Sequence, residues 1–344
     1  MLAGMTSTGR ARRPTLEQVA AEAGVSRGTV SRVVNGSLEV SPRALKAVQE
    51  AIRKLGYVPN QAARSLVTRR SDTVLLVVSE SEARVFSEPF FGSLVRGISQ
   101  ELSATPLQLN LMMASTARQH DRVEQLVRNG HVDGVVLISL HGDDPLPRNL
   151  AAAGSPVVLG GRPISDLGGV PYVDADNLAG AKSATEYLHR QGRRRIATIT
   201  GPQDMAPGID RLEGYRRALR GRRGGARLVA QGDFGQASGE VAMRELLAAD
   251  PAVDAVFAAS DLMAAGALRA LRAAGRRVPD DVAVIGFDDS AVAQHTDPAL
   301  TSVSQPVQRM GRELARLLVA RIREPGTVLD PVVLPTELVV RESA

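Results

Sequence analysis

Hydrophobic positions follow two different patterns along the chain. Between Leu16 and Leu55, apolar residues recur every three or four positions, which is the spacing typical of amphipathic helices. From Thr73 onward, short apolar runs alternate with longer segments of helical spacing. Continuous apolar strands separated by helices predict parallel sheets with helices on both faces. The pattern therefore predicts a small all-helical unit followed by a larger α/β unit.

The helical unit begins with two helices joined by a tight turn. Thr15-Leu16-Glu17-Gln18 has the form of a capping box, and Gly24 is suited to end the helix that follows. Ser26 is placed to cap a second helix that runs to about Val34. The short turn between them matches the spacing of a helix-turn-helix motif.

Two further helices are expected before the α/β unit. Ser41-Pro42 combines a capping hydroxyl with a proline at the first helical position, and Gly56 is suited to end this third helix. Tyr57-Val58-Pro59 is expected to be extended, because the residue before a proline avoids the helical region. Asn60 is placed to cap a short fourth helix over residues 61–66.

The α/β unit repeats one scheme of strands and helices, which predicts two lobes. Strands are expected at residues 73–78, 107–112, 134–138, 156–159, 196–200, 227–230, 255–258, 282–287 and 332–340. Helices are expected at residues 91–103, 117–129, 147–153, 178–191, 211–220, 239–249, 262–274 and 307–323. The simplest topology then crosses between the lobes near residues 160–172, 290–305 and 325–332.

Positive charge is concentrated at the start of the chain. Residues 1–70 hold 12 Lys and Arg against 4 Asp and Glu, whereas the net charge of the whole chain is +5, so the rest is mildly acidic. A basic unit on a mildly acidic body is the electrostatic pattern of a phosphate-binding module. A three-helix bundle of any function would share the apolar pattern, and the charge balance is what favours DNA binding.

The helical unit also resembles a known family. The segments VAAEAGVSRGTVSRVVNG and LGYVPNQAARSL, and the distance between them, are similar to the N-terminal domain of the lac and galactose repressor (LacI/GalR) family. The resemblance implies that the second helix enters the major groove and that a leucine wedges into the minor groove. By position it implies DNA contacts from Thr15, Ser26, Arg27, Gly28, Thr29, Ser31, Arg32, Asn35, Asn60, Ala63 and Leu66.

Chemistry agrees with these implied roles. Arginines such as Arg27 and Arg32 can bond guanine O6 and N7 with two hydrogen bonds, and short hydroxyls suit phosphate oxygens. A leucine forced between base steps, as implied for Leu66, kinks the duplex. Gly28 has no side chain for reading a base, so it leaves room for Arg27 or allows close approach to the DNA.

The resemblance continues into the α/β unit and implies a fold and a site. EPFFGSLVRGI, DRLEGYRRAL, AASDLMAAGALRAL and VAVIGFDDS are similar to motifs in the family's effector-binding part, a two-lobed periplasmic-binding-protein-like domain of type I. Ligands of open α/β sheets bind at the carboxyl ends of strands, here in the cleft between lobes. The candidate effector-binding residues are Phe90, Ser139, His141, Arg162, Arg211, Ser260 and Asp288.

Two features of these candidates depart from the family or stay open. Ser260 stands where many members have an asparagine, and Ser81–Ser87 looks like an insertion before EPFF. Arginine with a carboxylate suits vicinal hydroxyls, and an aromatic such as Phe90 or Phe91 suits the apolar face of a sugar ring. The alternatives are that the two phenylalanines belong to the lobe core and that Asp289 only caps a helix or forms a salt bridge.

Other classes of protein have little support. The chain has no cysteine, its five histidines lack metal-binding spacing, and no dinucleotide, P-loop or nucleophile-elbow motif is present. We therefore expect no cofactor, no metal and no enzymatic activity. Neither a secretory signal nor a membrane span is recognisable, which favours a cytoplasmic protein. No leucine heptad follows the last strand, so we expect a dimer formed through the lobes.

The sequence as a whole predicts an all-α helix-turn-helix headpiece with an α/β two-lobed sensor. We expect a homodimeric regulator, a repressor, that binds a pseudo-palindromic double-stranded operator under the control of a small molecule, most simply a sugar. A solute-binding protein or an enzyme on the same scaffold are the alternatives. The expected parts are a disordered tail (1–13), the DNA-binding domain (14–58), a hinge (59–72) and the sensor (73–344), with lobe 1 at about 73–165 and 304–326 and lobe 2 at about 170–292 and 330–344.

Overall fold

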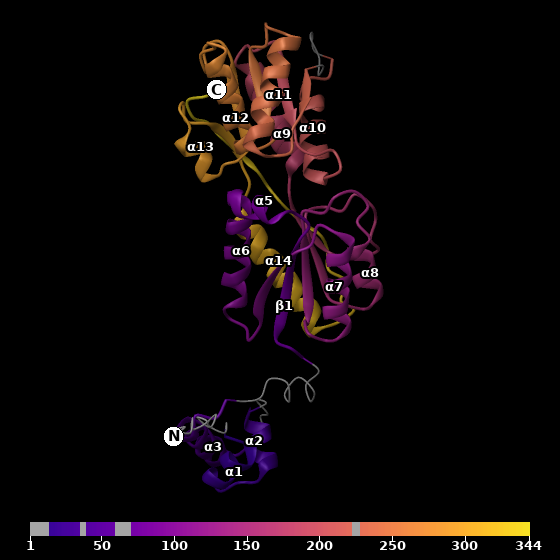
Figure 1. The fold of residues 1–344 in the computed structure, drawn as a ribbon, viewed down its shortest axis with the longest axis vertical. Coiled ribbons are helices and arrows are strands. Elements are labelled where there is room, and N and C mark those ends of the chain that lie inside the picture. The colour runs from indigo at the N-terminus through magenta and orange to yellow at the C-terminus, as the bar shows by residue number, and fades with distance from the viewer. Residues whose placement is uncertain (1–13, 35–38, 59–69, 222–227) are drawn as a thin grey trace, which may run out of the picture. The chain divides into compact units, whose positions relative to one another are not determined.

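The computed structural model describes residues 14–34, 39–58, 70–221 and 228–344. The chain forms two compact units, residues 1–71 and 72–344 (Figure 1). The predicted tail and the predicted fourth helix lie outside the described residues. So do four of the proposed DNA contacts, namely Asn35, Asn60, Ala63 and Leu66.

The described part of the first unit contains three helices where the sequence predicted them: α1 (Leu16–Ala23), α2 (Arg27–Val34) and α3 (Pro42–Leu55). The Thr15 hydroxyl accepts a hydrogen bond from the Gln18 amide, and the Gln18 side chain accepts one from the Thr15 amide at 2.9 Å, which completes the capping box. Gly24 follows α1 in the left-handed conformation (φ 65°), which glycine adopts without strain.

A compact apolar core holds the three helices of the first unit together. Val19, Val30 and Val48, one from each helix, are fully buried, and Tyr57 packs against this core from the segment after α3. The Ser26 hydroxyl accepts a hydrogen bond from the Thr29 amide at 3.1 Å, so it caps α2 as expected. The helix-turn-helix of the sequence is therefore a folded, packed unit.

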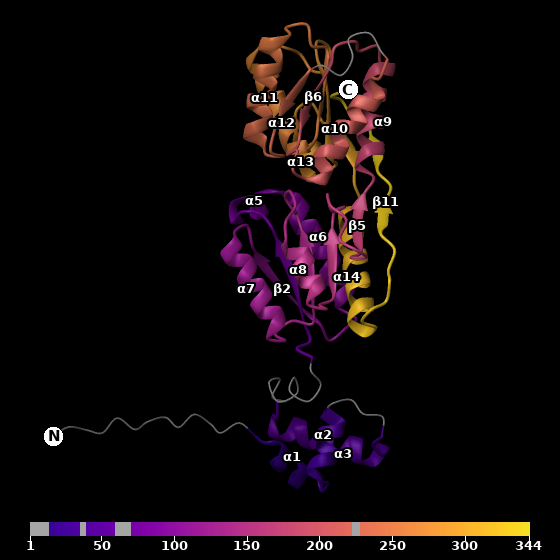
Figure 2. The same cartoon turned by 90° about the vertical axis from the view of Figure 1, so that its right-hand side faces the viewer.

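The second unit consists of two lobes, each with one twisted sheet covered by helices (Figures 1 and 2). Lobe 1 has the strand order β11-β5-β4-β3-β1-β2 and lobe 2 the order β12-β10-β9-β8-β6-β7. The strands of lobe 1 are β1 (Thr73–Val78), β2 (Gln108–Met113), β3 (Gly134–Ile138), β4 (Val157–Gly160), β5 (Tyr172–Ala175) and β11 (Val332–Leu334). Those of lobe 2 are β6 (Ile196–Thr200), β7 (Val229–Gln231), β8 (Ala255–Ala258), β9 (Ala283–Asp288), β10 (Thr301–Ser304) and β12 (Glu337–Val339).

Helices cover both faces of each sheet. Lobe 1 carries α5 (Glu82–Ser87), α6 (Pro89–Leu102), α7 (Ala117–Arg128), α8 (Leu146–Ala152) and α14 (Val307–Arg323). Lobe 2 carries α9 (Asn177–Arg190), α10 (Ala206–Ala218), α11 (Gln236–Ala249), α12 (Asp261–Ala273) and α13 (Ala291–His295). In β1, Leu76 packs toward α6 and α14 whereas Val77 packs toward α7 and α8, which is why this strand reads as a continuous apolar run. The predicted fold class is confirmed.

The lobes divide the chain differently from the predicted boundaries. β5 pairs with β4, so the first crossing follows Ala175 and not residues 160–172. The second crossing lies between β10 and α14, at the end of the expected range. The expected last strand is two strands: β11 completes lobe 1, and β12 pairs antiparallel with β10 in lobe 2. A short strand at a sheet edge carries too little apolar signal to assign it to a lobe from sequence.

Four other elements differ from the prediction. Helix α10 begins at Ala206, one turn before Asp210-Arg211, so these two residues lie inside the helix and not at its start. The expected insertion at Ser81–Ser87 forms a helix of its own, α5, capped by the Ser81 hydroxyl. β10 and α13 were not expected, because their short segments contain Ser, Thr, His and Gln between the apolar positions.

Candidate functional site

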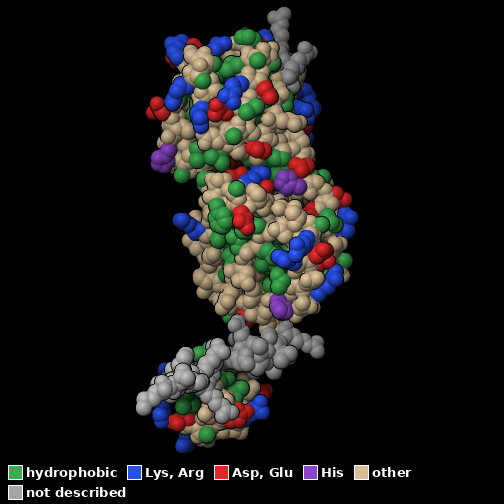
Figure 3. Space-filling model, in the orientation of Figure 1, with side chains coloured by type: hydrophobic (Ala, Val, Ile, Leu, Met, Phe, Trp, Pro, Cys, Tyr) green, Lys and Arg blue, Asp and Glu red, His purple; other side chains and the backbone are tan. Residues whose placement is uncertain are grey.

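A cavity of about 1040 Å³ lies between the two lobes, at the carboxyl ends of the strands. Its wall includes residues of both lobes, from the end of β3 and the start of α6 to the end of β9. In Figure 3, charged side chains gather at the narrowing between the lobes.

The floor of the cavity, as we name Arg211 with Asn177, Asp288 and Gln305, is a fixed polar network. Arg211 is 5% exposed, donates to Asn177 Oδ1 at 2.9 Å and to the Ala259 carbonyl at 2.6 Å, and lies 3.6 Å from Asp288 Oδ1. Asp288 Oδ1 also accepts from Gln305 Nε2 at 2.6 Å. Arginine and carboxylate are thus held side by side, a donor and an acceptor suited to neighbouring hydroxyls.

Burial shapes the charges of the floor. Burial lowers the pKa of Arg211, and the nearby carboxylates of Asp288 and Asp174 oppose this effect. Burial raises the pKa of Asp288, and the Arg211 guanidinium opposes it. Burial also raises the pKa of Asp174 to about 6, although the amides of Arg162 and Ala175 donate to that carboxylate. An effector that supplies hydrogen bonds here would replace solvation that the fold has removed.

Aromatic rings line the wall above the floor. Phe234 has a left-handed backbone (φ 71°), which is rare for an aromatic residue, and its ring centroid lies 5.5 Å from the Arg211 guanidinium carbon. A Cβ at Gly201 would lie 2.2 Å from this ring, so glycine there makes room for it. Phe90 lines the cavity, and Phe91, 4% exposed, packs in the lobe core while also reaching the wall.

Three other predicted effector residues line the cavity, and each makes different contacts. Ser260 donates to the Phe234 carbonyl at 2.8 Å and accepts from the Met263 amide, so its hydroxyl fixes the Phe234 loop. Arg162 of lobe 1 forms a 2.7 Å ion pair with Asp210 of lobe 2 and so links the lobes. Ser139 has a left-handed backbone (φ 55°) at the end of β3.

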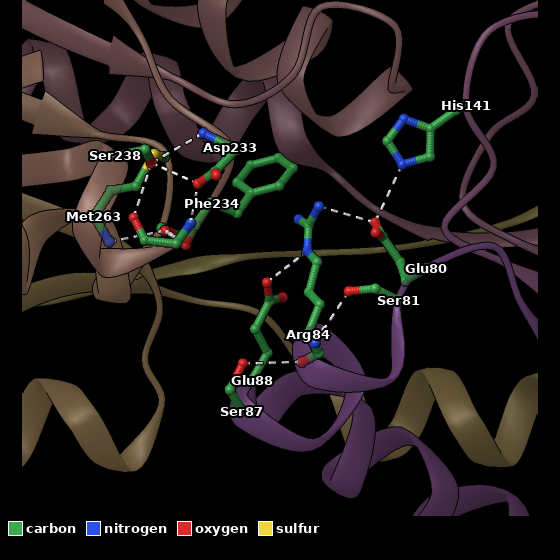
Figure 4. Close-up of polar contacts among 12 residues, drawn as sticks. Glu80, Ser81, Arg84, Ser87, Glu88, His141, Asp233, Phe234, Ser238 and Met263 are labelled. Carbon is green, nitrogen blue, oxygen red and sulfur yellow. Dashed lines mark hydrogen bonds and ion pairs between the residues drawn. The ribbon is translucent and has the colours of Figure 1, made fainter. Parts of the chain in front are cut away.

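His141 is the predicted effector residue that is not part of the cavity wall. Its Nδ1 lies 2.9 Å from Asp204 Oδ2 of lobe 2. Its Nε2 lies 3.2 Å from Glu80 Oε1 of lobe 1, the contact drawn in Figure 4. Both ring nitrogens therefore face carboxylates. The hydrogen bond to Glu80 raises the pKa of His141, and that to Asp204 adds to the effect. His141 is thus a bridge between the lobes beside the cavity. Asp289, the other residue left open, forms a 2.6 Å ion pair with Arg341.

The predicted reading face of α2 is solvent-exposed. Arg27, Gly28 and Arg32 are exposed, whereas Val30 on the opposite face is buried. Arg27 forms an exposed 3.1 Å ion pair with Glu17, which DNA phosphates or bases can displace.

The hydroxyls assigned to phosphate contacts lie near this face. Thr15 and Ser26 are exposed at the starts of α1 and α2, and Thr29 and Ser31 are half-buried on α2.

Several residues of the cavity wall were not predicted. They are Arg84, Glu88, Asp174, Asn177, Met205, Phe234 and Gln305. Asp174 lies in β5 and Asn177 follows it, and this strand was itself missed. The rule that ligands bind at the carboxyl ends of strands therefore could not point to these two residues. Phe234 depends on a backbone conformation that leaves no mark in the sequence.

Two absences hold for the described residues. They contain no helix long and apolar enough to span a membrane. They also contain no group of His, Cys, Asp or Glu arranged to hold a metal ion.

Comparison with known proteins gives the same division of the chain. Residues 15–60 match the family model of bacterial regulatory proteins, lacI family, and residues 185–344 match that of a periplasmic binding protein-like domain. The chain is 57% identical over 343 residues to the HTH-type transcriptional regulator CelR of Thermobifida fusca, a match covering 97% of this chain and 99% of that protein. It is 34% identical over 331 residues to the ribose operon repressor of Halalkalibacterium halodurans, covering 96% of each.

Solved structures resemble the whole chain. A complex of the transcriptional regulator CelR with cellobiose is 55% identical with a TM-score of 0.77, and the match covers 96% of this chain and 100% of that one. The lac repressor dimer bound to operator and the anti-inducer ONPF is 26% identical with a TM-score of 0.83, covering 96% and 99%. The helix-turn-helix headpiece, the two-lobed sensor and the sequence identity over nearly the whole chain lead to one conclusion. The chain is a DNA-binding transcriptional regulator and belongs to the LacI family of bacterial regulatory proteins.

Proposed function

We propose that this regulator is a cytoplasmic, homodimeric repressor without enzymatic activity, that it binds a pseudo-palindromic operator, and that its operator affinity is set by a sugar bound between the lobes. Cellobiose is the first candidate, since it occupies a similar regulator of known structure. The parts are a DNA-reading unit over residues 14–58, a hinge over residues 59–72 and the sensor that follows.

The observation that carries the proposal is the floor of the cavity. Arg211 and Asp288 lie 3.6 Å apart beneath the aromatic wall that includes Phe234 and Phe90. A sugar ring offers hydroxyls at its edge and an apolar face of C–H groups. A paired donor and acceptor beside aromatic rings suits both surfaces of such a ring.

The link between the two units is proposed to be mechanical. The cavity wall comes from both lobes, so a ligand that bonds to both favours one lobe arrangement over others. It can shift that equilibrium only by its difference in affinity for the arrangements. The hinge residues join the DNA-reading unit directly to β1 of lobe 1, which gives a lobe movement a path to the DNA-reading units of the dimer.

A solute-binding protein would bind sugar without an effect on DNA, and an enzyme would turn it over. The test is to select operator sequences from random duplex DNA with the full chain, then measure operator affinity by fluorescence anisotropy with and without cellobiose. We expect an inverted repeat and a cellobiose-dependent change in affinity of at least about fivefold, the low end of allosteric coupling. If calorimetry shows that cellobiose binds while the operator affinity stays unchanged, the solute-binding alternative is favoured. If the protein converts cellobiose into a product, the enzyme alternative is favoured.

A further inference from the structure

The short helix α5 places two charged side chains at the edge of the cavity. Arg84, within α5, and Glu88, between α5 and α6, both line the cavity opposite lobe 2. We name these two residues the rim. The guanidinium carbon of Arg84 lies 5.6 Å from the ring centroid of Phe234 in lobe 2. The rim therefore faces the Phe234 ring, which also lies beside Arg211 of the floor.

Both rim side chains are largely withdrawn from solvent and held in place. Arg84 and Glu88 are 18% and 14% exposed, and Arg84 Nε donates to Glu88 Oε1 at 2.6 Å. Arg84 Nη1 lies 3.0 Å from Glu80 Oε1, the atom that also meets His141 (Figure 4). Burial raises the pKa of Glu88, while Arg84 opposes this. The guanidinium is thus fixed from two sides.

Part of the rim's hydrogen-bonding capacity is unused. Among the residues that the structure describes, Arg84 Nη2 and Glu88 Oε2 have no hydrogen-bond partner, since the side-chain contacts of Arg84 use Nε and Nη1 and that of Glu88 uses Oε1. A cation donor and a carboxylate acceptor side by side are the pair suited to neighbouring hydroxyls. The rim therefore repeats the chemistry of the floor at a second place in one cavity.

Phe234 lies beside both pairs. Its ring centroid is 5.5 Å from the Arg211 guanidinium carbon and 5.6 Å from that of Arg84. A single hexose that is held by Arg211 and Asp288 satisfies one arginine–carboxylate pair and leaves the other unused. A ligand with two linked rings satisfies both.

We propose that Arg84 and Glu88 form a second hydroxyl-binding subsite, which takes the outer ring of a disaccharide and makes the sensor select disaccharides over monosaccharides. The inference rests on the proposed sugar-binding function and adds the length of the ligand to it. In this view α5 is a specificity element. The competing explanation is that Arg84 only anchors α5, in which case its loss would weaken all ligands alike.

The test compares two sugars in four forms of the full chain. Cellobiose has both rings, and methyl β-D-glucoside has one. The variants are Arg84→Met and Glu88→Gln, which remove the subsite from each side. The control is Arg128→Met, because Arg128 forms a 2.6 Å pair with Glu124 on α7 of the same lobe but is 67% exposed. Dissociation constants are measured by isothermal titration calorimetry, with the glucoside measured by displacement of cellobiose.

We expect Arg84→Met and Glu88→Gln each to weaken cellobiose by roughly 10-fold or more, the loss of one charged hydrogen bond, with less than about twofold change for the glucoside. Arg128→Met should change neither. Equal weakening of both sugars, or full retention of cellobiose affinity, would overturn the subsite. If the unaltered protein binds neither sugar, the proposed function itself fails. If it binds cellobiose and the variants keep the same preference, only the rim assignment fails.

Discussion

The exposed face of α2 and the floor of the cavity use arginine in opposite ways. Arg32 is exposed, whereas Arg211 is 5% exposed and touches Asn177, the Ala259 carbonyl and Asp288. A partner as large as DNA can be bound by charged side chains that the fold leaves exposed to solvent. A small ligand has to be met by groups that the fold has already desolvated and oriented. Substitutions on the reading face should therefore cost binding alone, and those in the cavity both binding and stability.

The largest effect is expected from Asp288→Ala. Removing this carboxylate deletes one ligand contact and leaves Gln305 Nε2 without its acceptor. We expect cellobiose affinity to fall about 100-fold and sensor stability by about 1–3 kcal/mol, with operator binding in the absence of sugar near normal. Calorimetry, denaturant unfolding and anisotropy check the three parts. An unchanged effector titration would remove Asp288 from the site.

Arg32→Ala should give the converse result. Operator affinity should fall by about 1–3 kcal/mol, because a guanine-reading arginine makes two hydrogen bonds to one base. Non-specific DNA binding and the melting temperature should stay unchanged, since the side chain is exposed. Parallel anisotropy titrations with operator and random duplexes measure this. Equal losses on both would mean that Arg32 meets only phosphates.

The variant Gly28→Ala tests whether the glycine in α2 is needed for the stability of the helix or for close contact with DNA. A Cβ at Gly28 would meet only the Ser26 hydroxyl, at an ordinary 3.7 Å, so the fold does not require glycine there. Alanine favours helix over glycine, and we expect the first unit to gain up to about 1 kcal/mol in stability. If glycine serves close approach to DNA, operator affinity should nevertheless fall. Higher stability with unchanged affinity would make Gly28 a plain helix residue.

The smallest effect is expected from pH at the His141 bridge. A neutral imidazole has one N–H, so only the protonated ring donates to both Glu80 and Asp204. Since the pKa of His141 is raised in this arrangement, the stabilisation is complete below its ordinary value of about 6.5 and is lost as pH rises through the raised value. Arg84 pairs with the same Glu80 oxygen.

Effector affinity should therefore decline by roughly two- to fivefold across that window, the range for a partly exposed ion pair. Calorimetric titration at several pH values measures the decline, and His141→Gln should remove it. A variant with an unchanged pH profile would show that another group titrates.

Sequence reasoning was successful where local patterns decide the structure. The capping box at Thr15, the glycine stop at Gly24 and the long apolar runs of β1 and β9 predicted their elements closely. It failed where tertiary pairing decides. β5 is four residues long and is defined by its neighbours β4 and β11, so Asp174 was missed with it.

The candidate site shows the same division. Arg211, Asp288 and Arg162 line the cavity as predicted, because they stand in or next to segments that are recognisable in the sequence. Arg84 and Phe234 were missed, since one depends on an insertion forming a helix over the cavity and the other on a left-handed backbone that aims its ring. The insertion itself was visible in the sequence, and only its helical structure was not.

The triple crossing between the lobes sets the order in which the chain can become functional during synthesis. The helices α1, α2 and α3 of the first unit are complete once Leu55 has left the ribosome. Lobe 1 still lacks α14 and β11, and lobe 2 lacks β12, until residues 307–339 have been made. Neither lobe can close its sheet early, and both finish within a few residues of each other. For most of its synthesis, each molecule carries a folded DNA reader that no effector can yet control.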